Sequence, residues 1–224
     1  MIPLRSSERV YSRPVVTGSL IVVNVLIYYY QWTLWTSSAY VFDQFVTNWG
    51  VVPDDLHVIS LFTSMFLHGS WLHVLGNMLF LWVFGRNVED LIGGTRFLIF
   101  YLVCGLVAGL VQVLANLHSS VPTVGASGAI AGVMGAYLIK FPRSQIDTLV
   151  LLFVFFTRLA IPAPFYILFW FGLQFLNGFE SIGEKNYTGG GVAYFAHIGG
   201  FVAGMLLIRL FPARQRWRHW YEES

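Results

Sequence analysis

The feature that most constrains the fold is a series of long apolar segments that lack acidic and basic side chains. The first of them runs from Val15 to Trp35. A helix of about 20 apolar residues crosses the roughly 30 Å hydrocarbon core of a bilayer. Only 11% of the 224 residues are charged, where a soluble domain has about 25%, and the mean hydropathy is +0.66. These values exclude a disordered tail, a nucleic-acid-binding module and an ordinary soluble enzyme, and they indicate a polytopic membrane protein.

The apolar segments predict an all-α fold with six membrane spans in a single bundle. We expect a tail at residues 1–14, a membrane domain at 15–211 and a second tail at 212–224. The expected spans are Val15 to Trp35, Leu61 or Trp71 to Phe84, Phe97 to Leu117, Ser127 to Ile139, Pro164 to Phe179, and Val192 to Phe211. A further apolar run, Thr148 to Phe156, would be only about 14 Å long as a helix, so we interpret it as a re-entrant or interfacial segment.

The basic residues predict the orientation of these spans. Twelve of the 13 Lys and Arg residues fall on one side of the six-span arrangement, and only Lys185 falls on the other. Basic residues concentrate in cytoplasmic loops, so both termini are expected in the cytoplasm. The compact build and this bias favour the plasma (inner) membrane of a bacterium, and an organelle stays open.

Four of the polar residues in the spans are candidates for function, because polar side chains there are costly and are functional hypotheses by default. They are His73, Asn77, Ser127 and His197. His73 and Asn77 share a helical face because they are four residues apart. His73, Ser127 and His197 each precede, by 12 or 13 residues, the basic residue that ends the span in the cytoplasm. At about 1.5 Å per residue, three spans therefore place these side chains at one depth, about 10 Å below the outer surface of the hydrocarbon core.

Small residues predict that the fourth and sixth spans pack closely. They recur every four residues in both segments, which lets two helix backbones approach. The residues are Gly128, Gly132 and Ala136 in one span, and Ala196, Gly200 and Gly204 in the other. This approach would bring Ser127 within hydrogen-bonding reach of His197. The single cysteine, Cys104, lies in an apolar run and is interpreted as a packing residue, so neither a disulfide nor a thiolate metal cluster is expected.

A serine and a histidine in contact permit nucleophilic catalysis, because neutral imidazole can remove the hydroxyl proton. No acidic residue is predicted at that depth, so the arrangement would be a dyad: Ser127 as nucleophile and His197 as general base. The start of a helix at Ser127 offers backbone N–H groups to an oxyanion, and His73 and Asn77 could add donors. Gly125 would leave room for a substrate backbone.

Other interpretations use the same residues. Each of the four polar residues, taken alone, is compatible with a packing or hydrogen-bonding role between helices. A small transporter with an intramembrane histidine relay is another alternative. It would be expected to contain an acid in the middle of the membrane or internal repeats, and the sequence has neither.

Three motifs, HVLGN at 73–77, GASGA at 125–129 and AHIGGFVAG at 196–204, resemble those of the rhomboid family of intramembrane serine proteases. The resemblance extends from about Val15 to Phe211. It implies cleavage of peptide bonds in or near the transmembrane segments of membrane-protein substrates, in the lipid bilayer, without metal, cofactor or nucleic acid. By position, Ser127 and His197 match the catalytic pair, and His73 and Asn77 match the oxyanion side.

The resemblance also implies roles for neighbouring residues. His68 matches a structural histidine, and the fifth span, with Trp170 and Phe175, matches a lateral gate. The loop from Glu180 to Gly191 matches a cap over the site. A proteolytically inactive relative that binds membrane clients is the alternative within this resemblance. The natural substrate and the oligomeric state stay open.

The sequence departs from the family pattern in two places. Ala131 occupies a position that often carries an aromatic residue stacked on the catalytic histidine, and Tyr194 or Phe195 are candidates to replace it. The Trp-Arg pair often found in the first loop is absent, because no Arg occurs between Arg13 and Arg86.

Overall fold

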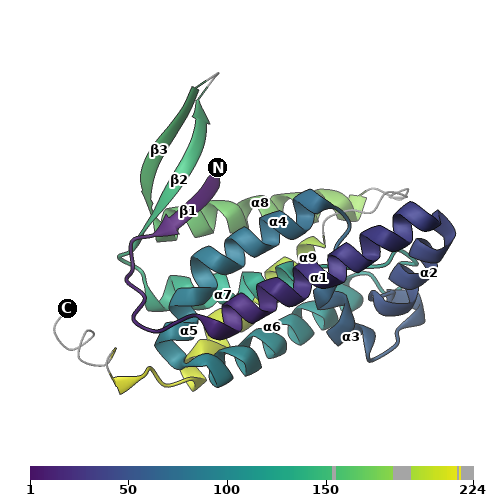
Figure 1. Ribbon diagram of the computed structural model, residues 1–224, viewed down its shortest axis with the longest axis horizontal. Helices are drawn as coiled ribbons and strands as arrows, with labels where there is room; N and C mark the ends of the chain where they lie inside the picture. Colours follow the sequence, from purple (N-terminus) through teal and green to yellow (C-terminus); the bar gives the residue numbers. More distant parts are fainter. Residues whose placement is uncertain (153–154, 184–192, 216, 218–224) are drawn as a thin grey trace.

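A computed structural model describes residues 1–152, 155–183, 193–215 and 217. The fold is mostly helical, and its longer helices run side by side (Figure 1). The helices are α1 (Val15–Ser37), α2 (Ala39–Trp49), α3 (Ser60–Thr63), α4 (Trp71–Phe80), α5 (Arg86–Ile92), α6 (Gly94–Ala115), α7 (Ser127–Lys140), α8 (Ala163–Gly183) and α9 (Tyr194–Leu207). Single helical turns lie at Pro53–Asp55, Ser64–Phe66, Leu81–Gly85 and Ile208–Leu210.

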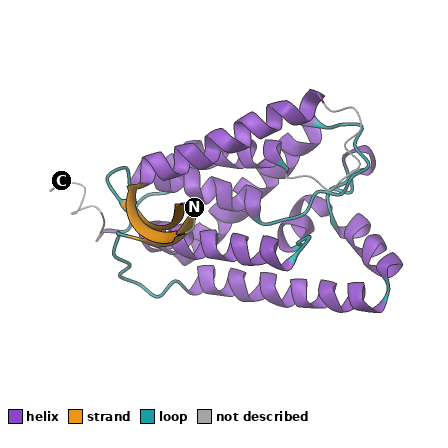
Figure 2. Cartoon of the chain, turned by 90° about the horizontal axis from the view of Figure 1, so that it is seen from above, coloured by secondary structure: helices purple, strands orange, loops and turns teal. Residues whose placement is uncertain are grey.

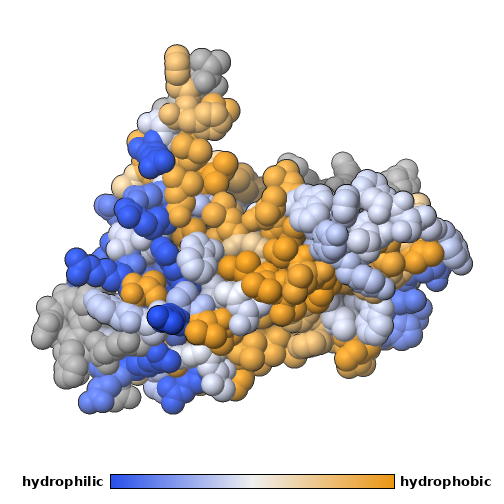
Figure 3. Space-filling view, in the orientation of Figure 1, coloured by the Kyte–Doolittle hydropathy of each residue, from blue (hydrophilic) through white to orange (hydrophobic). Residues whose placement is uncertain are grey.

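The described residues include helices suited to a bilayer. α1 and α6 are long and apolar enough to cross it, and a third candidate is the pair Ser60–Phe66 and Trp71–Ile92, which bends by 94°. α7, the Ala163–Leu176 part of α8, and the segment Tyr194–Leu210 are apolar but shorter. Apolar surface covers the middle of the helices, and hydrophilic residues gather at the end where α5 and the start of α1 lie (Figures 1 and 3). The chain is therefore a membrane protein, as predicted.

A small sheet corrects the all-α prediction. β1 (Ile2–Ser6), β2 (Gln145–Leu152) and β3 (Phe155–Pro162) form an antiparallel sheet in the order β1-β2-β3. The sheet projects from one end of the helices and across their direction (Figures 1 and 2). The prediction of a re-entrant or interfacial segment at Thr148 to Phe156 is therefore wrong for its described residues, because 148–152 and 155–156 belong to two paired strands. The prediction assumed that this segment is a helix. However, β-branched and aromatic residues recur through 145–162, and such residues favour extended backbone.

The sheet is attached to the helices through its first strands. Ile146 and Thr148 of β2 are fully buried, and Ser6 of β1 hydrogen-bonds the hydroxyl of Tyr137 in α7 over 2.5 Å. Part of the predicted N-terminal tail is therefore folded against the protein. At the far end, Phe155 is 75% exposed.

Two buried carboxylates fix the start of α1. The Glu89 carboxylate accepts hydrogen bonds from the backbone N–H groups of Val16 (2.9 Å) and Thr17 (2.7 Å). Asp90 accepts from the backbone N–H groups of Tyr11 and Ser12. The first N–H groups of a helix have no partner within the helix, so α5 supplies acceptors that the sequence around α1 lacks.

The predicted close approach of the fourth and sixth spans is confirmed as the packing of α7 against α9. A methyl group on Gly200 would overlap the carbonyl oxygen of Gly128, and one on Gly204 would overlap that of Gly132. Cys104 of α6 is fully buried and packs beside Gly132, as expected for a packing residue. This contact sets the distance between the first turns of α7 and α9, where the site lies.

Candidate active site

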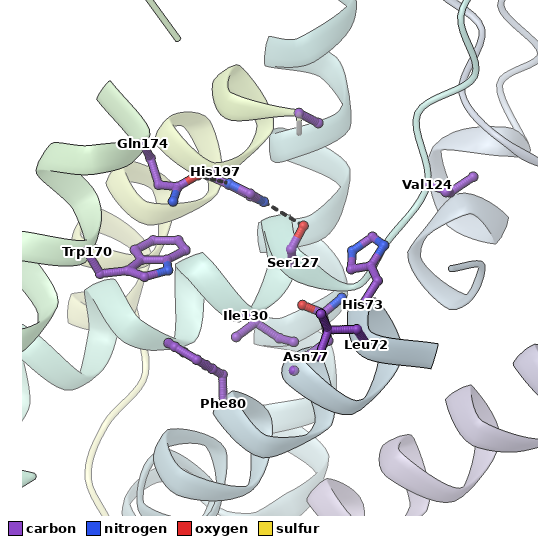
Figure 4. A pocket seen from close by; sticks show the side chains of 12 residues that line it. Leu72, His73, Asn77, Phe80, Val124, Ser127, Ile130, Trp170, Gln174 and His197 are labelled. Atoms are coloured by element: carbon purple, nitrogen blue, oxygen red, sulfur yellow. Dashed lines mark hydrogen bonds between the residues drawn. The ribbon is translucent and has the colours of Figure 1, made fainter. Parts of the chain in front are cut away.

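Ser127 and His197 are hydrogen-bonded to each other across the α7–α9 contact. Ser127 is the first residue of α7, and His197 lies in the first turn of α9. The distance between Ser127 Oγ and His197 Nε2 is 2.6 Å (Figure 4). His197 is 6% exposed. The structure therefore brings together the serine and the histidine that the sequence singled out.

The loop that leads into α7 is held by backbone hydrogen bonds. Thr123 and Val51 exchange two of them, at 2.8 and 3.0 Å, and the Gly125 N–H donates to the Ser64 carbonyl over 2.9 Å. Gly125 has a φ of +133°, which side-chain-bearing residues rarely adopt. A Cβ there would lie 2.9 Å from His73 Nε2, so the glycine is required by both conformation and space.

A pocket of about 370 Å³ opens beside the Ser127–His197 pair. α4 contributes His73 and Asn77, and α8 contributes Trp170 and Gln174 (Figure 4). Among the described residues that line it there is no Asp or Glu. Phe175, predicted with Trp170 as a gate residue, lies on α8 outside this lining and is 45% exposed.

One hydrogen bond of the His73 ring indicates which of its two nitrogens carries the proton. The backbone N–H of Gly69 donates to His73 Nδ1 over 3.4 Å, so Nδ1 acts as an acceptor. A neutral imidazole carries one N–H, which then lies on Nε2. The donor nitrogen of His73 is thus the one that faces Gly125 and the first turn of α7.

Asn77 is oriented by residues from two other segments. Its Nδ2 lies 3.0 Å from Nε2 of His68, which is fully buried. The backbone of His68 is held in turn by the Gln31 side chain of α1, which accepts from the His68 N–H over 2.9 Å and donates to its carbonyl over 3.2 Å. The sequence analysis missed Gln31. The available signal was a polar amide side chain in a mostly apolar first span.

Gln174 is a second residue that sequence reasoning missed. Its Oε1 lies 2.7 Å from His197 Nδ1. The Trp170 ring lies beside the same imidazole, with centroids 5.5 Å apart and planes inclined by 43°. Trp170 thus supplies an aromatic neighbour for His197, whereas Ala131, at the position that often carries one, is fully buried. The signal for Gln174 was its position four residues after Trp170, on the same helical face.

Two further expectations concern the surroundings of the pocket. The predicted cap, Glu180 to Gly191, lies outside the described residues from residue 184 onward, and residues 180–183 belong to α8. Within the described ranges, no three His, Cys, Asp or Glu side chains are grouped so that they could hold a metal ion.

This geometry defines a class of protein. It is a helical membrane protein with a hydrogen-bonded serine and histidine in a pocket between its helices. Residues 55–214 match the Rhomboid domain. The chain belongs to the rhomboid family.

Named relatives agree with this assignment. The chain is 31% identical over 152 residues to "Rhomboid protein 1, mitochondrial" of Saccharomyces cerevisiae, a match that covers 66% of this chain and 40% of that protein. It is 29% identical over 182 residues to "Rhomboid protease GlpG" of Salmonella choleraesuis, covering 78% and 58%. The GlpG of Salmonella paratyphi A is similar at 28% identity. The chain therefore spans about half the length of these relatives.

Proposed function

We propose that this protein is an intramembrane serine endopeptidase that cleaves peptide bonds in or near the transmembrane segments of other membrane proteins. The observation that carries the proposal is the 2.6 Å hydrogen bond between Ser127 Oγ and His197 Nε2 at the edge of a pocket. A distance of 2.6–3.2 Å between nucleophile and base is the signature of an activated hydroxyl. The names of the bacterial relatives, which include the word protease, support the same reaction class.

In the proposed reaction, Ser127 Oγ attacks the carbonyl carbon of the scissile peptide bond while its proton moves to His197 Nε2. The tetrahedral intermediate carries a negative oxygen, which requires donors aimed at it. His197 then returns the proton to the leaving amine, and the peptide C–N bond breaks. Water, activated by the same imidazole, hydrolyses the acyl-enzyme ester and regenerates the Ser127 hydroxyl.

The oxyanion donors that we assign are three. The backbone N–H of Ser127 is in the first turn of α7, where N–H groups lack helical partners. His73 offers Nε2–H, because Nδ1 accepts from Gly69. Asn77 Nδ2 carries two hydrogens, of which one bonds His68 and the second is left for the oxyanion. Gly125 leaves space for the substrate backbone.

We further propose six membrane crossings, with residues 1–14 and 212–224 in the cytoplasm and the protein in the plasma membrane of a bacterium. The arginines near both termini and the hydrophilic surface around α5 and the start of α1 support this orientation. Substrates would reach the pocket laterally between α4 and α8, which both contribute to its lining. In this arrangement Trp170 lines the entrance and Phe175 lies on the outer part of α8.

The test is cleavage of a single-span membrane protein by the purified chain in liposomes. We expect Ser127→Ala to lower the rate by at least about 10³-fold, and His197→Ala to do the same. Ser37→Ala is the matched control, because Ser37 lies at the exposed end of α1, where its hydroxyl bonds only a carbonyl of its own helix in the contacts described. Equal cleavage by Ser127→Ala and the parent would refute the protease assignment and favour a client-binding relative without proteolytic activity.

A further inference from the structure

The imidazole of His197 is held on two sides by α8. Gln174 Oε1 lies 2.7 Å from Nδ1, and the Trp170 ring lies 5.5 Å from the imidazole centroid. Gln174 and Trp170 are four residues apart, so they project from one face of α8 toward α9 (Figure 4). Gln174 contacts Nδ1 and Trp170 lies beside the imidazole ring, whereas Ser127 contacts Nε2.

The Gln174 contact determines which nitrogen carries the proton. A glutamine carbonyl oxygen only accepts hydrogen bonds, so the 2.7 Å contact requires a hydrogen on Nδ1. A neutral imidazole has one N–H, and Nε2 is therefore left with a lone pair directed at the Ser127 hydroxyl. This is the tautomer that a general base needs, because the other one would present a hydrogen to Ser127 Oγ.

An amide suits this position better than a carboxylate would. The imidazolium that forms during attack donates through both nitrogens, and the Gln174 carbonyl stabilises it through its dipole. A carboxylate would stabilise the cation more strongly, but an isolated buried carboxylate in the resting site carries a large desolvation penalty. A neutral acceptor orients the base without leaving a charge within the membrane.

The orienting residues belong to a helix other than the one that carries the base. α8 packs on α9 through the Phe171 and Phe201 rings, whose centroids are 4.4 Å apart and nearly parallel. Trp170 and Gln174 also line the pocket, on the side away from His73 and Asn77 of α4 (Figure 4). A displacement of α8 away from α9 would therefore remove the acceptor from Nδ1 and the ring from beside the imidazole at the same time.

We propose that Gln174 is a positioning residue that holds His197 as the Nδ1–H tautomer and that Trp170 fixes the ring plane, so that the base is ready only while α8 is packed on α9. The expected effect on kcat rests on the proposed protease function. The positioning role implies that a substrate displaces α4, and that α8, with Gln174 and Trp170, is in place when the peptide bond is attacked.

Steady-state cleavage by Gln174→Leu and Gln174→Glu tests the proposal. The leucine has nearly the same volume and no acceptor, so kcat is expected to fall by about 10- to 100-fold, with KM changed by less than about threefold. The glutamate keeps an acceptor on Nδ1 and is expected to retain kcat within about tenfold of the parent. Because a carboxylate stabilises the protonated imidazole, the acid limb of the pH–rate profile should move to higher pH in Gln174→Glu.

The matched control is Leu176→Ala, two residues further along α8, where the side chain is 60% exposed. It should leave kcat and the acid limb unchanged. A residue that only supports packing would not move the acid limb, so a Gln174→Glu profile that coincides with the parent profile would overturn the proposal. An unchanged kcat in Gln174→Leu would overturn it as well.

A spectroscopic arm separates this proposal from the proposed function. In protein labelled with ¹⁵N-histidine, the His197 signal is assigned by its loss in His197→Ala. We expect a protonated Nδ1 and an unprotonated Nε2 in the parent, and a mixture of tautomers in Gln174→Leu. An unprotonated Nδ1 in the parent would overturn the positioning role whether or not the protein cleaves a substrate. If the tautomer is as expected and cleavage does not depend on Ser127, the protease function alone fails.

Discussion

Replacing Gly125 by alanine perturbs the loop that joins the proposed nucleophile to the proposed oxyanion side. The φ of Gly125 is +133°, and strain at such an angle amounts to about 1–3 kcal/mol for a residue with a Cβ. The added methyl carbon would lie 2.9 Å from His73 Nε2, where ordinary contact begins at 3.4 Å. At that distance either the imidazole or the loop must shift.

This displacement predicts a loss in turnover rather than in substrate binding. Removal of one oxyanion donor lowers kcat by about 10²–10³-fold, so Gly125→Ala should lower kcat by about 10²-fold or more. KM should change much less, because the donor acts on the intermediate. The assay is cleavage of the single-span substrate in liposomes, with the unfolding temperature measured in parallel.

Two further variants make the result decisive. Gly18→Ala in α1 is the control, since a Cβ there meets nothing within 4 Å, and it should cleave like the parent. His73→Ala removes the donor without strain in the loop and should give a loss of the same order as Gly125→Ala. A kcat for Gly125→Ala within about threefold of the parent would refute the assignment of His73 to the oxyanion side.

The remaining predictions concern stability. Glu89→Ala leaves the N–H groups of Val16 and Thr17 without their acceptors; at about 1.5–3 kcal/mol for each charge-assisted bond, the unfolding temperature should fall clearly, and an unchanged value would contradict the role of Glu89 as the cap of α1. Burial raises the pKa of the Glu8 carboxyl above its usual value of 4.5, so its ionised form is disfavoured in the folded protein; Glu8→Gln should be more stable than the parent at pH 7.5, and the difference should vanish as the pH falls below about 4.5. Gly200→Val should abolish folding or sharply lower the unfolding temperature, because its Cβ overlaps the Gly128 carbonyl, whereas Gly172→Ala, with no atom within 4 Å of its Cβ, should not.

The helical part of the fold could be predicted from sequence because its determinants are local. Apolar length gives the helices, and small residues four apart give the α7–α9 contact. The three-stranded sheet could not be predicted in this way, because β1 and β2 are more than 130 residues apart in the chain. Their pairing depends on tertiary contacts, such as that of Ser6 with Tyr137.

The candidate site likewise contains residues that the sequence reveals and residues that only contacts between helices reveal. Ser127, His73 and His197 can be singled out from the sequence because polar side chains are costly in apolar spans and helix rise predicts one common depth for all three. Gln174 and Gln31 are also polar residues in apolar segments, yet neither belongs to a motif, and their meaning comes from partners on other helices. Only the three-dimensional contacts at His197 Nδ1 and at the His68 backbone reveal what they do.

The measurement that tests the central claim most directly is covalent labelling of the purified protein by a fluorophosphonate, followed by peptide mapping. An activated serine reacts through its hydroxyl, and the reaction requires a neighbouring base. We predict modification at Ser127 in the parent. The rate of labelling at Ser127 should be lower by about 10²-fold or more in His197→Ala. Labelling at other serines only, or equal rates at Ser127 in the parent and in His197→Ala, would contradict the claim that His197 activates Ser127.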